Sequence, residues 1–191
     1  MTYTQAKQKL FNRLYKNLND KQKEAVFNVN GPVLVLAGAG SGKTTVLVNR
    51  ISHIINYGDA YFRETEAPEG INMGYMQYLM DYGDNIQIRD FLKQTAVEPA
   101  LPSRVLCVTF TNKAAEEFRA RLKSSLGDRA GEIWAGTFHS ICVRILRKHI
   151  HLLDSDNSFT IYDSDDSKKT ITACLKKLNL SDEIMTPAVL Q

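Results

Sequence analysis

Apolar residues gather in three short continuous runs, and each run leads through a polar turn into a stretch with helical spacing. The runs are PVLVLA (32–37), RVLCVTF (104–110) and EIWAGTF (132–138). Continuous apolar runs of this length, as opposed to alternating ones, are typical of strands that are covered on both faces of a sheet. The pattern therefore predicts three buried strands.

Behind each run, apolar side chains recur at helical spacing. They are Leu47, Ile51, Ile54 and Ile55 after the first run, Ala115, Phe118 and Leu122 after the second, and Ile141, Ile145 and Leu146 after the third. Gly127 is expected to cap the second helix at its carboxyl end. Repeated strand–turn–helix units predict an α/β fold in which helices flank a largely parallel sheet. Ligands of such sheets bind at the carboxyl ends of the strands, where the three polar turns lie.

The connection between the first helix and the second strand, residues 57–103, is longer than compact α/β units require. At roughly 45 residues it is predicted to be an insertion, with short helices expected over 73–83 and 86–94. Tyrosine and methionine are concentrated in it. Two interpretations stay open: a partner-docking element, or a decoration that packs on its own domain.

Charge is unevenly distributed in a chain whose net charge is +3. Residues 57–103 hold eight acidic and three basic residues, a net charge of −5, which leaves +8 for the rest. This division indicates a polyanionic partner for the basic part and not for the insertion. No apolar run approaches the ~20 residues that cross a bilayer, and the N-terminus has no apolar signal core. We therefore expect no membrane association and a cytoplasmic location.

The turn after the first run reads AGAGSGKT (37–44), the pattern of a phosphate-binding loop between a strand and a helix. Its glycines allow successive backbone N–H groups to point at a phosphate, and the amino end of the following helix adds to the attraction. Lys43 is expected to reach the β- and γ-phosphates, and the Thr44 hydroxyl to bind Mg²⁺. In this context the pattern favours a nucleotide over the alternative, a glycine-rich turn without a ligand.

Hydrolysis of a nucleotide also needs a carboxylate at a second strand end and an arginine that meets the transition-state charge. The later candidate is Asp163 in SFTIYDSDDS (158–167). However, Asp163 followed by Asp166 and then by a helical pattern is typical of a helix N-terminal cap. We therefore interpret Asp163 as a cap and expect the catalytic carboxylate to be absent from this chain.

The turns after the second and third runs read TFTNKAAEEF (109–118) and GTFHS (136–140). Hydroxyl, amide and lysine groups at a helix N-terminus suit phosphate oxygens, and Phe110 offers a face for base stacking. Polar capping of the two helices is the alternative that each turn on its own would favour.

Four segments, in this order, resemble the opening motifs of the UvrD/Rep/PcrA group of superfamily 1 DNA helicases. LNDKQKEAV (18–26) resembles the Q motif of that family, AGAGSGKT motif I, TFTNKAAEEF motif Ia and GTFHS motif Ib. FTIYDSDD (159–166) resembles the stretch that opens the family's 1B subdomain. The resemblance covers nearly all of the chain outside residues 57–103.

The resemblance implies ATP and Mg²⁺ as cofactors. Gln22 would read the adenine, Arg50 would sit behind the loop, and Lys43 and Thr44 would be its catalytic residues, with Thr44 as the metal ligand. The residues expected to surround the phosphates are Ala39, Gly40, Ser41, Gly42, Lys43, Thr44 and Thr45. Those expected to contact single-stranded DNA are Phe110, Thr111, Asn112, Thr137, Phe138 and His139.

The resemblance also implies a domain plan. A partial RecA-like P-loop NTPase domain, 1A, would occupy residues 1–56 and 104–150, around the insertion at 57–103, and the mostly helical subdomain 1B would begin over 151–191. The family's acidic motif II and later arginines are not found. We therefore expect the N-terminal part of an ATP-dependent 3′–5′ DNA helicase or translocase of DNA repair or replication, which does not hydrolyse ATP by itself.

The expected partners are single-stranded or partly duplex DNA and the remainder of the helicase. A bare sheet edge would also favour self-association. Two alternatives for the function stay open: the helicase subunit of a helicase–nuclease, and a non-catalytic nucleotide-gated DNA-binding module. A P-loop kinase is disfavoured because it predicts neither TFTNKAA nor GTFHS.

Overall fold

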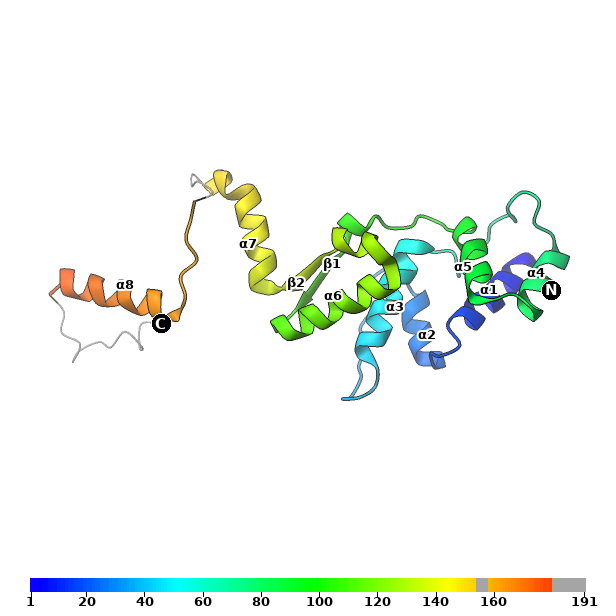
Figure 1. Ribbon diagram of the computed structural model, residues 1–191, viewed down its shortest axis with the longest axis horizontal. Coiled ribbons are helices and arrows are strands. Elements are labelled where there is room, and N and C mark those ends of the chain that lie inside the picture. Colours follow the sequence, from blue (N-terminus) through cyan, green and yellow to red (C-terminus); the bar gives the residue numbers. More distant parts are fainter. Residues whose placement is uncertain (154–157, 180–191) are drawn as a thin grey trace. The chain divides into compact units, whose positions relative to one another are not determined.

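The structure is a computed structural model that describes residues 1–153 and 158–179 (Figure 1). These residues form a helix-rich α/β fold with a small parallel sheet. The chain divides into two compact units, Met1–Cys142 and Val143–Gln191. None of the helices in the described ranges is long and apolar enough to cross a membrane.

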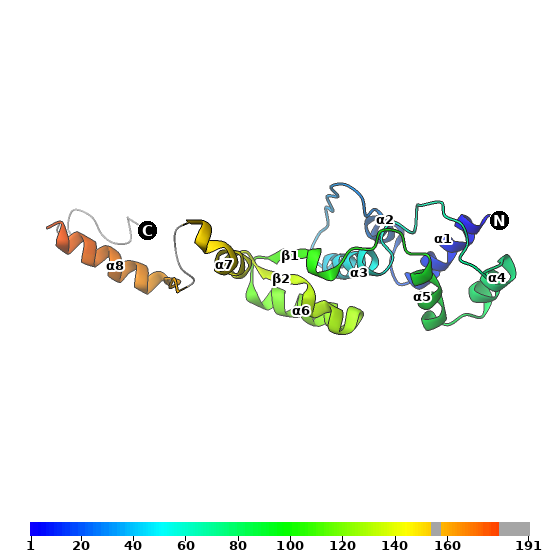
Figure 2. The ribbon, with the colours of Figure 1, turned by 90° about the horizontal axis from the view of Figure 1, so that it is seen from above.

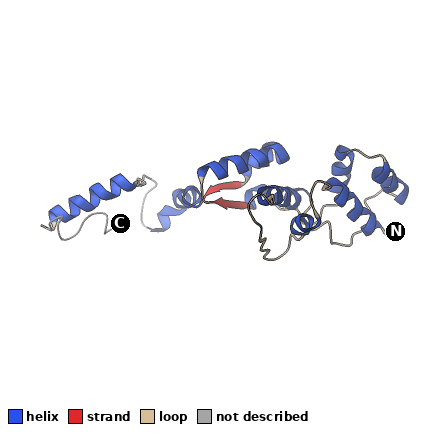
Figure 3. Ribbon diagram, turned by 90° about the horizontal axis from the view of Figure 1, so that it is seen from below, coloured by secondary structure: helices blue, strands red, loops and turns tan. Residues whose placement is uncertain are grey.

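The sheet of the first unit consists of β1 (Leu106–Thr109) and β2 (Trp134–Thr137), drawn red in Figure 3. The two strands are parallel, with Leu106 beside Trp134 and Thr109 beside Thr137. They are joined by α6 (Asn112–Leu126), which packs against both strands, and by the 3₁₀ turn η2 (Gly127–Glu132). A second 3₁₀ turn, η1 (Pro102–Arg104), precedes β1. The prediction of two parallel strands with a helix between them is confirmed, as is Gly127 as the cap of that helix, with a φ of 62°.

The first apolar run, residues 32–37, is not a strand, so the prediction of three buried strands is wrong at this place. It is also wrong in part for β1, in which Cys107 is buried but Leu106 is 56% exposed. The side chains of the run at 32–37 are exposed, Leu34 at 84% and Leu36 at 87%. A strand is held by hydrogen bonds to a neighbouring strand, and an apolar run is buried only when both faces of its sheet are covered. Within the described residues β1 and β2 pair with each other alone, so this run has no neighbour despite its composition.

The core beside the sheet lies between α6 and α3 (Lys43–Asn56). The cluster consists of Val48, Ile51, Ile55, Cys107, Phe118, Leu122, Leu126, Ile133 and Ala135. The predicted apolar stripe of α3 is thus confirmed at Ile51 and Ile55, whereas Leu47 is 45% exposed. On its other side α3 packs against α2 (Asp20–Phe27), so the helix behind the glycine loop joins both halves of the unit.

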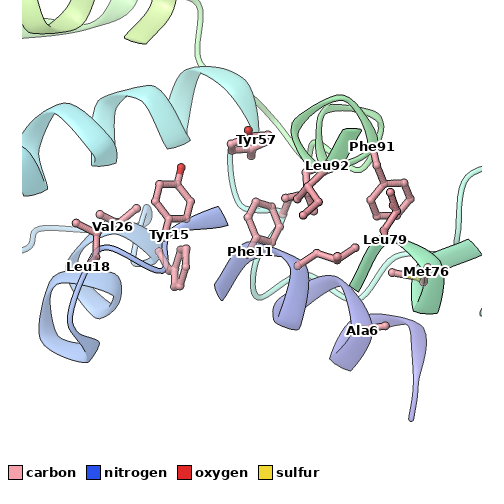
Figure 4. Close-up of a cluster of buried hydrophobic side chains, with 14 of the residues drawn as sticks. Ala6, Phe11, Tyr15, Leu18, Val26, Tyr57, Met76, Leu79, Phe91 and Leu92 are labelled. Carbon is pink, nitrogen blue, oxygen red and sulfur yellow. The ribbon is translucent and has the colours of Figure 1, made fainter. Parts of the chain in front are cut away.

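A second core unites α1 (Tyr3–Leu14) with two helices of the insertion, α4 (Met73–Asp81) and α5 (Asn85–Gln94) (Figures 2 and 4). Met76 and Leu79 of α4 and Phe91 of α5 are buried against α1. The Arg13 guanidinium donates to the carbonyl oxygens of Leu79, Met80 and Gly83, at the end of α4. The two helices predicted in the insertion are confirmed, and their buried faces pack on their own unit.

Beyond the sheet, α7 (Phe138–His149) starts directly after β2 and is followed by the 3₁₀ turn η3 (Ile150–Leu153). Of its predicted apolar stripe, Ile141 is buried, whereas Ile145 is 44% exposed. In the second unit, α8 (Ser164–Lys177) begins at Asp163, whose Oδ1 accepts from the backbone N–H groups of Asp165 at 2.9 Å and Asp166 at 2.8 Å. The interpretation of Asp163 as a helix cap is confirmed.

Candidate functional site

The glycine loop, residues 38–42, leads from the exposed apolar run into α3. Gly40 and Gly42 have φ angles of 75° and 83°, in the left-handed region that favours glycine. Gly42 is the N-cap of α3, and no side chain caps this helix. By contrast, Asn19 caps α2 and Thr111 caps α6. The first N–H groups of α3 therefore carry the partial positive charge of a helix N-terminus toward the loop without a side chain that covers them.

Lys43, the first residue of α3, folds back over the loop. Its Nζ donates to the carbonyl oxygen of Ala37 at 3.1 Å and of Gly38 at 2.6 Å. The side chain is exposed, so these two neutral acceptors can be exchanged for phosphate oxygens, which form stronger, charge-assisted hydrogen bonds. Thr44 is half-buried in the first turn of the same helix, while Ala39 and Thr45 are exposed.

Gln22 connects α2 to the glycine loop. Its Oε1 accepts from the backbone N–H of Asn19 at 3.0 Å, which completes a capping box, and its Nε2 donates to the carbonyl oxygen of Ser41 at 3.1 Å. A Cβ at Gly42 would lie 3.0 Å from the same Nε2. The residue that the resemblance assigns to the adenine is thus already at the loop, and one hydrogen of its amide nitrogen is used there. Sequence reasoning missed Asn19, although Asn followed three positions later by Gln is a recognisable capping-box pattern.

Arg50 of α3 connects this helix to α2. Its Nη1 donates to the carbonyl oxygen of Ala25 at 2.5 Å and to that of Asn28, at the end of α2. Burial lowers the pKa of the guanidinium. Beside it, a cavity of about 280 Å³ lies between α3 and the exposed run, and it is lined by Val33, Val35, Lys43, Val46, Leu47 and Arg50.

The two polar turns at the carboxyl ends of β1 and β2 meet. Because the strands are parallel and Thr109 is in register with Thr137, the residues that follow them lie side by side. The rings of Phe110 and Phe138 have centroids 5.6 Å apart at an interplanar angle of 46°. Phe110 is 90% exposed and Phe138 is 53% exposed, so these large apolar rings face solvent together.

The threonine hydroxyls of these turns accept hydrogen bonds from the first turns of the helices that follow. Thr111 Oγ1 accepts from the N–H of Ala114 at 3.2 Å, and Thr137 Oγ1 accepts from the N–H of Ser140 at 3.3 Å. Asn112 and His139 are exposed beside them. Capping thus accounts for both threonines but not for the exposed phenylalanines. Ser140, which the sequence did not single out, also donates from its Oγ to the Thr137 carbonyl oxygen at 2.9 Å.

Comparison with known proteins identifies a family for this chain. The model of the UvrD/REP helicase N-terminal domain matches residues 18–65 and 87–189. The chain belongs to this family. Residues 66–86, which contain α4, fall outside the match.

Curated relatives agree with the family assignment. An ATP-dependent DNA helicase PcrA of Staphylococcus epidermidis is 37% identical over 176 residues, which are 92% of this chain and 19% of the relative. An ATP-dependent DNA helicase PcrA of Staphylococcus aureus is 36% identical over the same shares of the two chains. The chain thus spans about a fifth of the length of these relatives.

Proposed function

We propose that the chain is the ATP- and single-stranded-DNA-contacting portion of an ATP-dependent 3′–5′ DNA helicase that acts in DNA repair or replication. The observation that carries this proposal is the uncapped amino end of α3 behind the glycine loop. It lies in the same unit as the exposed Phe110–Phe138 pair, so both kinds of contact belong to one folded body. The names of the PcrA relatives support the reaction.

For the nucleotide, we assign the phosphates to the backbone N–H groups from Ala39 to Thr45 and to Lys43. These N–H groups fit a polyphosphate because they lead into a helix N-terminus that no side chain caps. The Thr44 hydroxyl would hold Mg²⁺, which supplies positive charge to the phosphate oxygens when bound. Gln22, at the loop through Ser41, would turn its second amide hydrogen to the adenine. Arg50 would keep α2 and α3 in place behind the site.

For the DNA, we assign base stacking to Phe110 and Phe138 and backbone contacts to the exposed Thr111, Asn112 and His139. Thr137, which the resemblance also assigned to the DNA, is buried with its hydroxyl bonded to Ser140, so it holds the turn in shape instead. Exposed aromatic faces are what stacking on an unpaired base requires. The capping threonines keep both turns in shape, so that the rings are presented from fixed strand ends. The +8 charge outside residues 57–103 supports attraction of a polyanion.

We further propose that this chain alone binds ATP–Mg²⁺ weakly and hydrolyses it at a background rate. Neither β1 nor β2, the strands of the described residues, ends in a carboxylate, and Asp163 is engaged as the cap of α8. The catalytic carboxylate and the arginines would come from the remainder of the helicase. In this plan residues 1–56 and 104–150 belong to a RecA-like domain 1A, 57–103 is inserted, and 151–191 opens subdomain 1B.

The test is a titration of the chain with a fluorescent ATP analogue in the presence of Mg²⁺. Lys43→Ala is expected to weaken binding at least about tenfold, because hydrogen bonds from a charged donor are lost. The matched control is Lys21→Ala, since Lys21 is an exposed lysine on α2. Unchanged affinity in Lys43→Ala would contradict the nucleotide site, and DNA-stimulated phosphate release that Lys43→Ala abolishes would contradict the proposed inactivity.

A further inference from the structure

Three tyrosine rings form a row on the surface of α4 and its end, and we call Tyr75, Tyr78 and Tyr82 the tyrosine row. The centroids of the first two rings are 6.4 Å apart and those of the last two are 5.9 Å apart. The side chains are 40%, 48% and 77% exposed, respectively. Positions three and four apart share one face of a helix, so the row is continuous.

The helix that carries the tyrosine row is anchored to α1 and α5. On the neighbouring face of α4, Met76 and Leu79 are fully buried against α1, and the Tyr75 ring meets Phe91 edge-on at 6.2 Å. Arg13 of α1 holds the carbonyl end of α4 through three acceptors. A ligand would therefore meet rings that are already placed, at a small cost in conformational entropy.

The stretch of chain that carries the row is acidic, although the guanidinium of Arg13 lies at the carboxyl end of α4. Residues 64–88 contain five carboxylates, those of Glu64, Glu66, Glu69, Asp81 and Asp84, and no lysine, arginine or histidine. All five of these acidic residues are exposed. A surface of this charge repels nucleic acid and attracts a cationic ligand.

The family match does not include the row. Residues 66–86 lie outside it, and all three tyrosines fall in that gap. The buried face of α4 explains why this segment packs on α1. It does not explain why three neighbouring tyrosine rings are exposed to solvent. Tyrosine is the residue type that protein interfaces favour, because its ring gives much contact area with few rotatable bonds.

We propose that the tyrosine row is a docking surface for a basic, extended segment of a partner protein, whose arginine or lysine side chains lie over the tyrosine rings. Cations are attracted to the faces of tyrosine rings, and the acidic residues near the row favour the same charge. In an extended segment, alternate side chains on one face are about 6.6 Å apart. This spacing matches the centroid separations of 6.4 Å and 5.9 Å within the row. The segment therefore carries its cations at every second position.

The test uses a fluorescein-labelled peptide, Gly-Arg-Ser-Arg-Ser-Arg-Ser-Arg-Gly, and the same peptide with glutamine at each arginine position. Anisotropy is measured with the 191-residue chain at about 0.15 M salt, where weak long-range attraction between exposed charges is screened. The arginine peptide is expected to bind and the glutamine peptide not to bind. Tyr78→Ala combined with Tyr82→Ala should weaken binding about tenfold, whereas Tyr→Phe at both positions should keep it, since the ring faces remain.

The matched control is Tyr162→Ala, because Tyr162 is 57% exposed but lies outside the row. If the arginine peptide binds as tightly after Tyr78 and Tyr82 are replaced by alanine, charge alone explains its binding, and the proposal is overturned. Dependence of single-stranded DNA binding, or of self-association in sedimentation, on the same two tyrosines would also overturn it. Thermal melting shows whether each variant is folded. If the double alanine variant is unfolded, the double phenylalanine variant, which should keep binding, still tests the proposal.

Discussion

The Tyr15 hydroxyl lies 3.2 Å from Nδ1 of His53 in a fully enclosed position between α1 and α3. Aromatic rings surround the imidazole, with the centroid of Phe11 at 5.2 Å and that of Phe27 at 5.4 Å. Its Nε2 has no hydrogen-bond partner within the described part of the chain. This burial, together with the nearby charge of Arg50, lowers the pKa of His53 to about 3.

This low pKa predicts that acid destabilises the first unit. Above the unfolded pKa of about 6.5 the imidazole is neutral in both states, so its full contribution to stability is present. As the pH falls from about 6.5 toward 3, His53 becomes protonated in the unfolded chain but stays neutral in the folded chain. The free energy of unfolding should then drop by about 2 kcal/mol between pH 7.5 and pH 5. Urea unfolding at the two pH values measures this change.

His53→Phe is the matched variant for this prediction, because it keeps an aromatic ring in the cluster and removes the titrating group. Loss of the hydrogen bond to Tyr15 should lower its stability at both pH values, but the difference in the free energy of unfolding between the two pH values should shrink. The three remaining histidines, His139, His149 and His151, are exposed and stay in place. An equal pH dependence in the variant and the unchanged chain would assign the acid sensitivity to other groups.

The aromatic pair at the strand ends predicts a specific loss of DNA binding. Phe110→Ala or Phe138→Ala should weaken binding of a short single-stranded oligonucleotide about tenfold, since stacking of one base contributes about 1–3 kcal/mol. Stability should hardly change for Phe110→Ala, because that ring is 90% exposed. Phe62→Ala removes a ring of the insertion that is 51% exposed, close to the 53% of Phe138, and serves as the control. Fluorescence anisotropy with labelled DNA measures the affinity of each variant. Equal losses of affinity in all three variants would refute the assignment of base stacking to Phe110 and Phe138.

The glycine at the start of α3 predicts a coupled loss of stability and nucleotide binding. Gly42→Ala would place a Cβ 3.0 Å from Gln22 Nε2 at a backbone φ of 83°, so both the contact and the conformation are strained. We expect a cost of about 1 kcal/mol in the free energy of unfolding and weaker binding of ATP–Mg²⁺. Gly131→Ala is the control, since nothing lies near its added Cβ and its φ is not in the left-handed region. Thermal melting and nucleotide titration of both variants test this, and identical behaviour would argue against the Gln22 contact.

Local patterns in the sequence predicted the parts of this structure that local forces determine. The helices after the three turns, the insertion helices, the Asp163 cap and the Gly127 cap follow from spacing and capping chemistry within a few residues. The run at 32–37 shows the limit of such patterns, because a strand depends on a neighbour that composition does not supply.

The candidate site divides in the same way. The glycine loop and its lysine were visible as a motif, but the hydrogen bond from Gln22 to Ser41 joins residues of different helices and needs tertiary structure. Likewise, each phenylalanine was visible at a strand end, whereas their contact follows from the register of Thr109 with Thr137. Sequence therefore indicated which residues to consider, and packing between segments determined which of them meet.

The exposed run at 32–37 leads to the last prediction, that copies of this chain associate through it. Leu34 and Leu36 are more than four-fifths exposed, and the segment PVLVLA has no charge that would oppose pairing with another copy. Unpaired apolar segments with high strand propensity recruit further strands. The mass from light scattering should rise with concentration, and Leu34→Lys combined with Leu36→Lys should return it to that of a monomer. Leu101→Lys with Leu152→Lys changes two other exposed leucines and should have no such effect. A monomer at every concentration in the unchanged chain would contradict the prediction.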